Sequence, residues 1–145
     1  MPTTLGRKFS LVWRGDPPHM LNTDIPVWYR FLEVYGHLFR SIWYDVCVGG
    51  PFYTQEELKD PLKKMWYQNL AKRIDALCEL ENEIWIIEVS SDPGLRSIGQ
   101  LLSYQILLNR DPKILKPEKL VLVAGTIESD LLDVAGTLSI RCYII

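Results

Sequence analysis

Two acidic residues on either side of a short predicted turn are the strongest candidates for chemistry in this chain. Residues 73–80 and 83–90 both have the apolar, β-branched pattern of strands, and a two-residue turn at 81–82 would join them as a hairpin. Counting outward from that turn places Asp75 directly opposite Glu88, on the same face and with Cβ atoms about 5 Å apart. A one-residue bulge would break this pairing. The sequence therefore predicts two adjacent carboxylates.

Two carboxylates at that separation repel each other, so either one is protonated or a cation lies between them. Mg²⁺ or Mn²⁺ is the natural cation, because both ions prefer oxygen ligands. Ile86 and Ile87 precede Glu88 in a strand that is apolar on both faces, which is typical of a central strand. The simpler alternative is that Asp75 and Glu88 are solvated strand-end residues or members of structural ion pairs.

The helix predicted over 95–108 carries a polar stripe that points toward the same region. Arg96, Gln100 and Tyr104 are spaced at i, i+4 and i+8 and therefore share one face. A helix that follows a strand packs back beside it, so the stripe is expected to reach the carboxylate end of the strand. The alternative is that these residues form the polar margin of an ordinary amphipathic helix.

The elements that must position these residues form an α/β fold, a mixed sheet flanked by helices in the order α-β-β-β-α-β-α-β. The hairpin is preceded by a helix over 26–42, capped by Asp24, and a strand over 43–48. Residues 55–70 are either a short helix or irregular. The helix over 95–108 is capped by Asp92, and the chain continues with a strand at 120–124, a helix at 129–135 ending at Gly136, and a strand at 139–145.

Composition limits the class of protein. The chain has 145 residues, 48% of them hydrophobic, which fits a single domain over 1–145 with a substantial core. No apolar run approaches the roughly 18–20 residues of a membrane span, so no membrane partner is expected. The net charge of −2 provides no overall field that would attract nucleic acid. Three widely spaced cysteines indicate buried, unpaired thiols in a reducing compartment, which favours the cytoplasm.

Three segments together resemble the PD-(D/E)xK nuclease superfamily. They are Ile74-Asp75-Ala76, then Ile86-Ile87-Glu88-Val89-Ser90, then Gln100-Leu101-Leu102-Ser103-Tyr104. The last segment resembles the Gln-x-x-x-Tyr motif of the RecB-like branch. The resemblance implies a restriction-endonuclease-like core that cleaves DNA phosphodiester bonds with Mg²⁺ or Mn²⁺.

The resemblance also implies roles for individual residues. Asp75, Glu88 and the Val89 carbonyl would be metal ligands, and Gln100 and Tyr104 would contact DNA or orient the site. Many members of the family also use a glutamate on the leading helix. Glu33 is the candidate here, although it shares a predicted solvated face with Arg30, His37 and Arg40, where ion pairing is the simpler expectation.

The chain departs from the family pattern at Ser90, where most members carry lysine. Losing that charge removes transition-state stabilisation of several kcal/mol. Arg96 is the best-placed replacement; it would stabilise phosphate charge but could not act as a base. Lys72 and Lys64 are weaker candidates. The alternative is a catalytically inactive nuclease fold that serves as a DNA-binding or structural subunit, for example of a phage or other viral particle. The compartment would then be the host cytoplasm or the virion, and the assembly a homo-oligomer or a larger complex.

The charge distribution favours DNA as a partner. Residues 74–93 contain six acidic residues and no lysine or arginine, and the basic segments 59–73 and 110–119 lie on either side. An acidic metal centre bordered by basic segments suits a protein that holds a phosphate backbone. Trp66 and Tyr67, in the first basic segment, could stack on bases. Local packing is the simpler interpretation of both.

Overall fold

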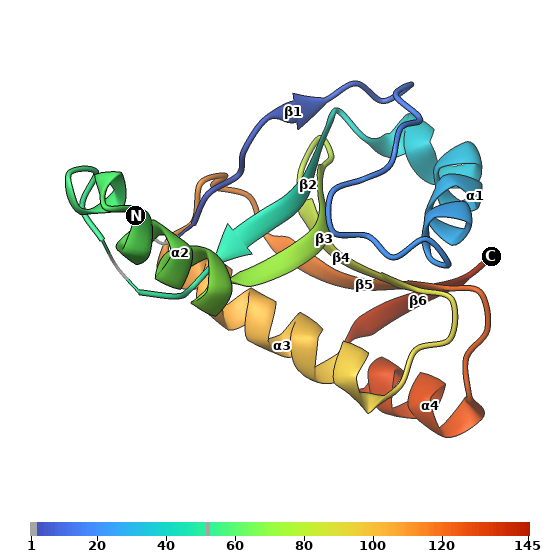
Figure 1. The fold of residues 1–145 in the computed structure, drawn as a ribbon. Coiled ribbons are helices and arrows are strands. Elements are labelled where there is room, and N and C mark those ends of the chain that lie inside the picture. The colour runs from blue at the N-terminus through green and yellow to red at the C-terminus, as the bar shows by residue number, and fades with distance from the viewer. Residues whose placement is uncertain (1–2, 52) are drawn as a thin grey trace.

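The computed structural model describes residues 3–51 and 53–145 and contains a six-stranded mixed sheet, which confirms the α/β class (Figure 1). The strands are β1 (Lys8–Phe9), β2 (Ser41–Val48), β3 (Lys72–Glu79), β4 (Ile84–Ser90), β5 (Glu118–Ala124) and β6 (Ile140–Ile144). The helices are α1 (Ile25–Tyr35), α2 (Pro61–Leu70), α3 (Leu95–Arg110) and α4 (Ser129–Thr137), with 3₁₀ turns at Gly36–Leu38 and Glu57–Lys59. The strands lie side by side in chain order, antiparallel from β1 to β4 and parallel from β4 to β6.

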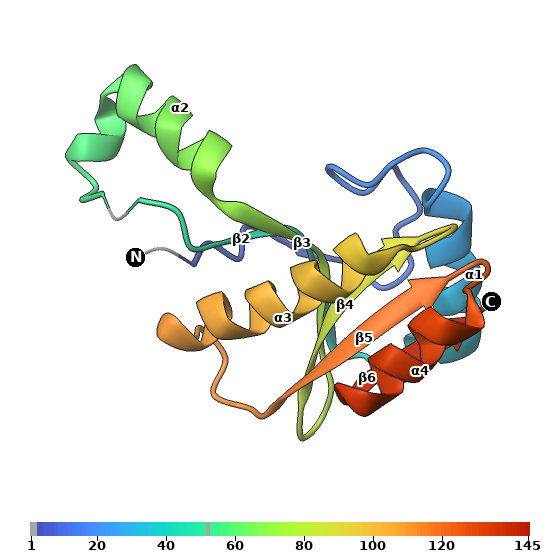
Figure 2. The same cartoon turned by 90° about the horizontal axis from the view of Figure 1, so that it is seen from below.

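Helices cover both faces of the sheet. Helix α1 lies on one face, and α3 and α4 lie on the other (Figures 1 and 2). Side chains of β4 pack on both faces of the sheet. Trp85, Ile87 and Val89 belong to the core beneath α1. Ile84 and Ile86 belong to the core beneath α3. Burial on both faces explains the nearly continuous apolar sequence of β4 and confirms that it is a central strand.

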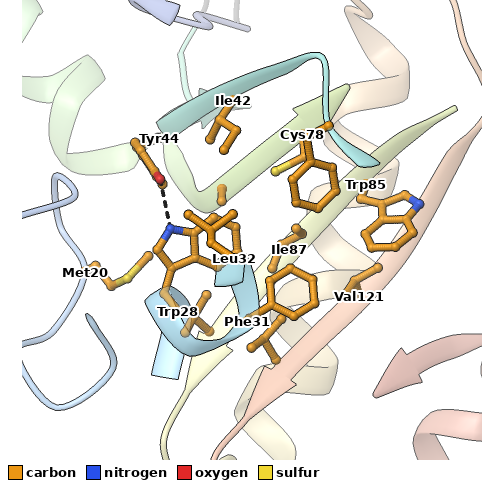
Figure 3. Close-up of a cluster of buried hydrophobic side chains, with 14 of the residues drawn as sticks. Met20, Trp28, Phe31, Leu32, Ile42, Tyr44, Cys78, Trp85, Ile87 and Val121 are labelled. Carbon is orange, nitrogen blue, oxygen red and sulfur yellow. Dashed lines mark hydrogen bonds between the residues drawn. The ribbon is translucent and has the colours of Figure 1, made fainter. Parts of the chain in front are cut away.

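Aromatic side chains hold α1 on the sheet (Figure 3). Trp28 is fully buried, and its indole N–H donates a 2.8 Å hydrogen bond to the Tyr44 hydroxyl on β2. The Phe31 ring stacks against Trp28 with centroids 5.5 Å apart. This packing fixes the orientation of α1 and hence the position of Asp24, which immediately precedes the helix.

The first helix is shorter than predicted. It ends at Tyr35, is followed by a 3₁₀ turn, and gives way to β2 at Ser41 instead of continuing to residue 42. Phe39 and Ile42, which fit the helical period, lie in extended backbone and are still buried in the core beneath α1. Their apolar spacing fits a helix only by coincidence. The extended segment that follows α1 packs on the same core, so it also needs buried residues at these positions.

Other boundaries differ in smaller ways. Strand β1 was not predicted, and the ambiguous segment 55–70 contains helix α2. Asp92 does not cap α3, because the N-cap position is occupied by Gly94 and has no side-chain cap. Helix α4 continues through Gly136 to Thr137.

The three cysteines are free, as predicted, but only Cys78 is fully buried, and Cys47 and Cys142 are half-buried. Among the described residues, none of the helices combines the length and apolar character that a membrane crossing requires.

Candidate functional site

The β3–β4 hairpin has the predicted register. Ala76 pairs with Ile87, and one further step along both strands brings Asp75 opposite Glu88. Backbone pairing stops at this point, and Asp75 Oδ2 instead accepts a 2.9 Å hydrogen bond from the Val89 backbone N–H. The predicted juxtaposition of the two carboxyl groups is confirmed, since both line the same cavity and each shifts the pKa of the other.

The Glu88 carboxyl group is buried without full hydrogen bonding. The residue is 5% exposed, and its Oε2 atom has no hydrogen-bond partner in the described part of the chain. Burial raises the pKa of Glu88 to about 10, and the hydrogen bond and charge of Asp75 add to the effect. Burial also raises the pKa of Asp75. The pair therefore retains a proton near neutral pH when no cation is bound.

A third carboxylate, Asp24, approaches the same region from the start of α1. Its Oδ1 atom accepts a 2.8 Å hydrogen bond from the Ser91 backbone N–H, and its charge helps to raise the pKa values of Asp75 and Glu88. Asp24 occupies the predicted N-cap position of α1, but its side chain makes no cap hydrogen bond. Its contact with a residue 67 positions away has no local sequence signal.

These groups line a cavity of about 490 Å³ at the carboxyl end of β4. Six of its lining residues are Asp24, Asp75, Glu88, Ser90, Asp92 and Arg96. Arg96 is the one lysine or arginine among the described residues that line it, and its charge lowers the pKa of Glu88. We refer to this space as the acidic cavity. Its charge balance favours a cation, because four acidic residues face one arginine.

The α3 stripe reaches the acidic cavity only in part. Arg96 and Gln100 line it, as predicted. Tyr104 is 4% exposed and lines a neighbouring hollow together with Gln100. Burial raises the pKa of Tyr104, and the charges of Glu88 and Asp75 raise it further. Tyr104 does not line the acidic cavity itself, but it lies where it can hold the Gln100 side chain in position.

Glu33, the glutamate that the resemblance suggested on the leading helix, does not line the acidic cavity. Its side chain is 74% exposed and lies 3.7 Å from Arg14 in an ion pair. The ion-pairing expectation for its face is correct, although the partner is Arg14 and not a residue of the helix itself. Asp24 is the carboxylate that the leading helix brings to the site.

The residues present fit a divalent ion, although they do not form a complete protein cage. Across residues 3–51 and 53–145, no three His, Cys, Asp or Glu side chains form a group able to hold a metal ion. Mg²⁺ commonly binds through one or two carboxylates and takes its other ligands from water and substrate phosphates. The buried, unpartnered Glu88 Oε2 next to Asp75 is the chemical feature that a cation would satisfy.

Comparison with known proteins found no matching family model, curated protein or solved structure. The chemistry that the residues themselves support is proton binding by a carboxyl pair, cation binding by the same pair, and anion binding at Arg96.

The raised pKa values predict how stability depends on pH. The unfolded chain releases the Glu88 proton near its ordinary value of 4.5, whereas the folded protein holds it to about 10. Between these values the folded state binds more protons, so the free energy of unfolding contributed by this group falls as pH rises. We expect the Tm in EDTA to decrease from about pH 6 to about pH 8.5 more steeply in the wild type than in Glu88→Gln.

Adding Mg²⁺ should raise the Tm of the wild type more at the higher pH, because metal binding requires the deprotonated pair. Thermal unfolding followed by circular dichroism measures both effects. Glu81→Gln is the matched control, because Glu81 is on the hairpin turn with its side chain 76% exposed. Equal pH slopes for the wild type and Glu88→Gln would contradict the prediction.

Proposed function

We propose that this chain is a metal-dependent nuclease-like domain that hydrolyses DNA phosphodiester bonds at the acidic cavity, with Mg²⁺ or Mn²⁺ as cofactor. The observation that carries the proposal is the contact between Asp75 and Glu88 in a cavity where Glu88 Oε2 is buried and lacks a partner. A buried carboxyl pair of this kind is costly to maintain. A function that needs the pair to bind a cation accounts for that cost.

Three groups would hold the metal ion: the carboxylates of Asp75 and Glu88 and the backbone carbonyl of Val89. The ion supplies Lewis-acid activation of water and charge neutralisation on the phosphate. The protein holds these groups in place, because the Val89 N–H fixes Asp75 and the hydrogen bond from Ser91 to Asp24 ties the following loop to α1. In the overall reaction, a water oxygen forms a bond to phosphorus as one phosphorus–oxygen ester bond breaks.

Arg96 takes the role of the family lysine in this proposal. It lies in the first turn of α3 and lines the acidic cavity beside Ser90, whose hydroxyl carries no charge. A guanidinium remains protonated, so Arg96 would stabilise negative charge on the phosphate without acting as a base. Gln100, steadied by Tyr104, offers an amide donor to the same phosphate.

The arrangement of elements supports the finer assignment to the restriction-endonuclease-like type. A leading helix is followed by antiparallel strands β2, β3 and β4, then by α3 and the parallel strand β5, which is the order that the resemblance implies. Strand β1 and helix α2 are additions to that order.

A second candidate function is an inactive nuclease fold that binds DNA or serves as a structural subunit, for example of a viral particle. Ser90 favours it, because the charge that most family members place at this position is missing. The two functions differ in a single measurable property, which is cleavage when a divalent ion is present.

The test is a cleavage assay with plasmid and single-stranded DNA in Mg²⁺, Mn²⁺ or EDTA. We expect cleavage with either metal and none in EDTA. Arg96→Ala should lower the rate about 10²–10³-fold, the usual effect of removing one transition-state charge partner. Arg96→Lys should recover part of that loss, because it restores a positive charge.

Arg110→Ala is the matched control, since Arg110 is an exposed arginine at the opposite end of α3. Its cleavage rate should equal that of the wild type. If the protein binds DNA but cleaves it with neither metal, hydrolysis is rejected and the inactive nuclease fold is supported.

A further inference from the structure

Three cations of the acidic cavity and the neighbouring hollows are set apart by their lack of an ion-pair partner among the described residues. Within the parts of the chain that the structure describes, Lys64, Lys72 and Arg96 have no ion-pair partner, and Lys72 contacts only a backbone carbonyl. Lys63, next to Lys64 on α2, is instead 3.5 Å from Glu57 in an ion pair. The basic segment is thus divided into neutralised lysines and lysines whose charge is available to an anion.

The three unpaired cations line hollows that adjoin one another. A hollow of about 640 Å³ is lined by Lys64 and Arg73, and a second of about 670 Å³ is lined by Arg73, Lys72, Arg96 and Gln100. Arg96 and Gln100 also line the acidic cavity. Neighbouring hollows share these lining residues, and we refer to the three adjoining hollows, from α2 to the acidic pair, as the groove.

Figure 2 shows α2 extending away from the sheet at the point where β3 begins. The middle hollow is lined on α3 by Gly99, which has no side chain, and by Ser103, whose side chain is small. Asn69 of α2 lines the same hollow. Trp66 on α2 is 51% exposed, consistent with the predicted stacking role, whereas the Tyr67 hydroxyl is within 3.0 Å of Thr4 Oγ1. The middle hollow is lined by no acidic side chain among the described residues.

Arg73 is held at the junction of the first two hollows. Its Nε atom is 3.7 Å from Asp45 Oδ1, and its guanidinium also contacts His19. Asp45 has a φ of 53°, a left-handed conformation that is uncommon outside glycine and that aspartate adopts more readily than most residues. The ion pair with Asp45 distinguishes Arg73 from the three cations that have no ion-pair partner.

We propose that one nucleic-acid strand lies along this groove, with its backbone phosphates held by Lys64 and Lys72 and one phosphate delivered past Arg96 to the acidic pair. The proposal names the substrate path of the proposed nuclease and rests on that function for its end point. A row of separated, unneutralised cations matches a polyanion with regularly spaced charges. The net charge of −2 makes this local row, and not the protein as a whole, the attractive element.

Fluorescence anisotropy of a labelled single-stranded DNA oligonucleotide in EDTA tests the path without metal or cleavage. The double variant Lys64→Ala/Lys72→Ala should bind roughly tenfold more weakly, because fewer phosphate contacts mean that fewer counterions are released on binding. The slope of log K against log salt should decrease in magnitude by about 1.4, or about 0.7 for each cation removed. Circular dichroism checks that this double variant and its control remain folded.

The control is Lys63→Ala/Lys119→Ala, which changes the net charge equally. Lys63 is the paired neighbour on α2, and Lys119 lies near the start of β5, outside the three hollows. Equal losses in the two double variants, or no binding by the wild type, would overturn the proposal. Stronger binding of duplex DNA than of single strands would also overturn it, and a parallel measurement with single-stranded RNA shows whether the sugar matters.

The proposed hydrolysis and the proposed strand path can be disproved independently of each other. If Lys64→Ala/Lys72→Ala selectively loses binding while no metal supports cleavage by the wild type, the strand path stands and hydrolysis is rejected. If the wild type cleaves and both double variants bind and cleave as it does, hydrolysis stands and the path is wrong.

Discussion

Replacing Glu88 with glutamine should lower metal-dependent cleavage by at least about 10²-fold, because loss of a metal ligand removes several kcal/mol of transition-state stabilisation. The fold should be unaffected. Burial raises the pKa of Glu88 to about 10, so the metal-free protein already holds this carboxyl in its protonated form, which glutamine imitates in shape and hydrogen bonding. The measurement is the cleavage rate in Mg²⁺ with saturating DNA.

Asp75→Asn should give a comparable loss, since the asparagine oxygen can still accept the hydrogen bond from the Val89 N–H. Glu81→Gln controls for the chemical change at an exposed position on the same hairpin. Wild-type cleavage rates in both Glu88→Gln and Asp75→Asn would remove the acidic pair from the mechanism, even if the protein proved to be a nuclease.

Replacing Trp28 with alanine should lower the free energy of unfolding by about 3–5 kcal/mol, the usual cost of truncating a large buried aromatic side chain. Trp28 is fully buried, and its removal also leaves the buried Tyr44 hydroxyl without its 2.8 Å partner. A loss of this size is a large fraction of the stability of an ordinary domain. Urea denaturation followed by circular dichroism measures it.

Trp66→Ala is the matched control for Trp28→Ala. Trp66 is 51% exposed on α2, and surface substitutions usually change stability by no more than about 0.5 kcal/mol. Trp28→Phe should fall between the two, because the ring is kept and the hydrogen bond is lost. Similar unfolding free energies for Trp28→Ala and Trp66→Ala would mean that α1 contributes little to the fold.

The hairpin and its acidic pair could be predicted from the sequence because the information is local. A two-residue turn sets the register of both strands, and that register alone brings Asp75 opposite Glu88. The apolar sequence around Ile86 and Ile87 indicated a central strand for the same reason, since burial on both faces leaves no room for polar residues.

The parts of the site that could not be predicted depend on contacts between distant segments. Asp24 has the sequence pattern of a helix cap, and only the packing of α1 against the sheet brings its carboxylate to the Ser91 N–H. The solvated face of Glu33 could be predicted from the helical pattern, but its ion-pair partner could not, because Arg14 lies outside the helix.

The spatial order of the strands has a consequence for how the molecule assembles. Every strand lies beside its neighbour in the chain, so the sheet can grow outward without threading one segment past another. The shortest connection between two strands joins β3 to β4, and closing a short loop costs the least chain entropy. We therefore expect the β3–β4 hairpin to form early and to bring Asp75 and Glu88 together before later strands and helices enclose them.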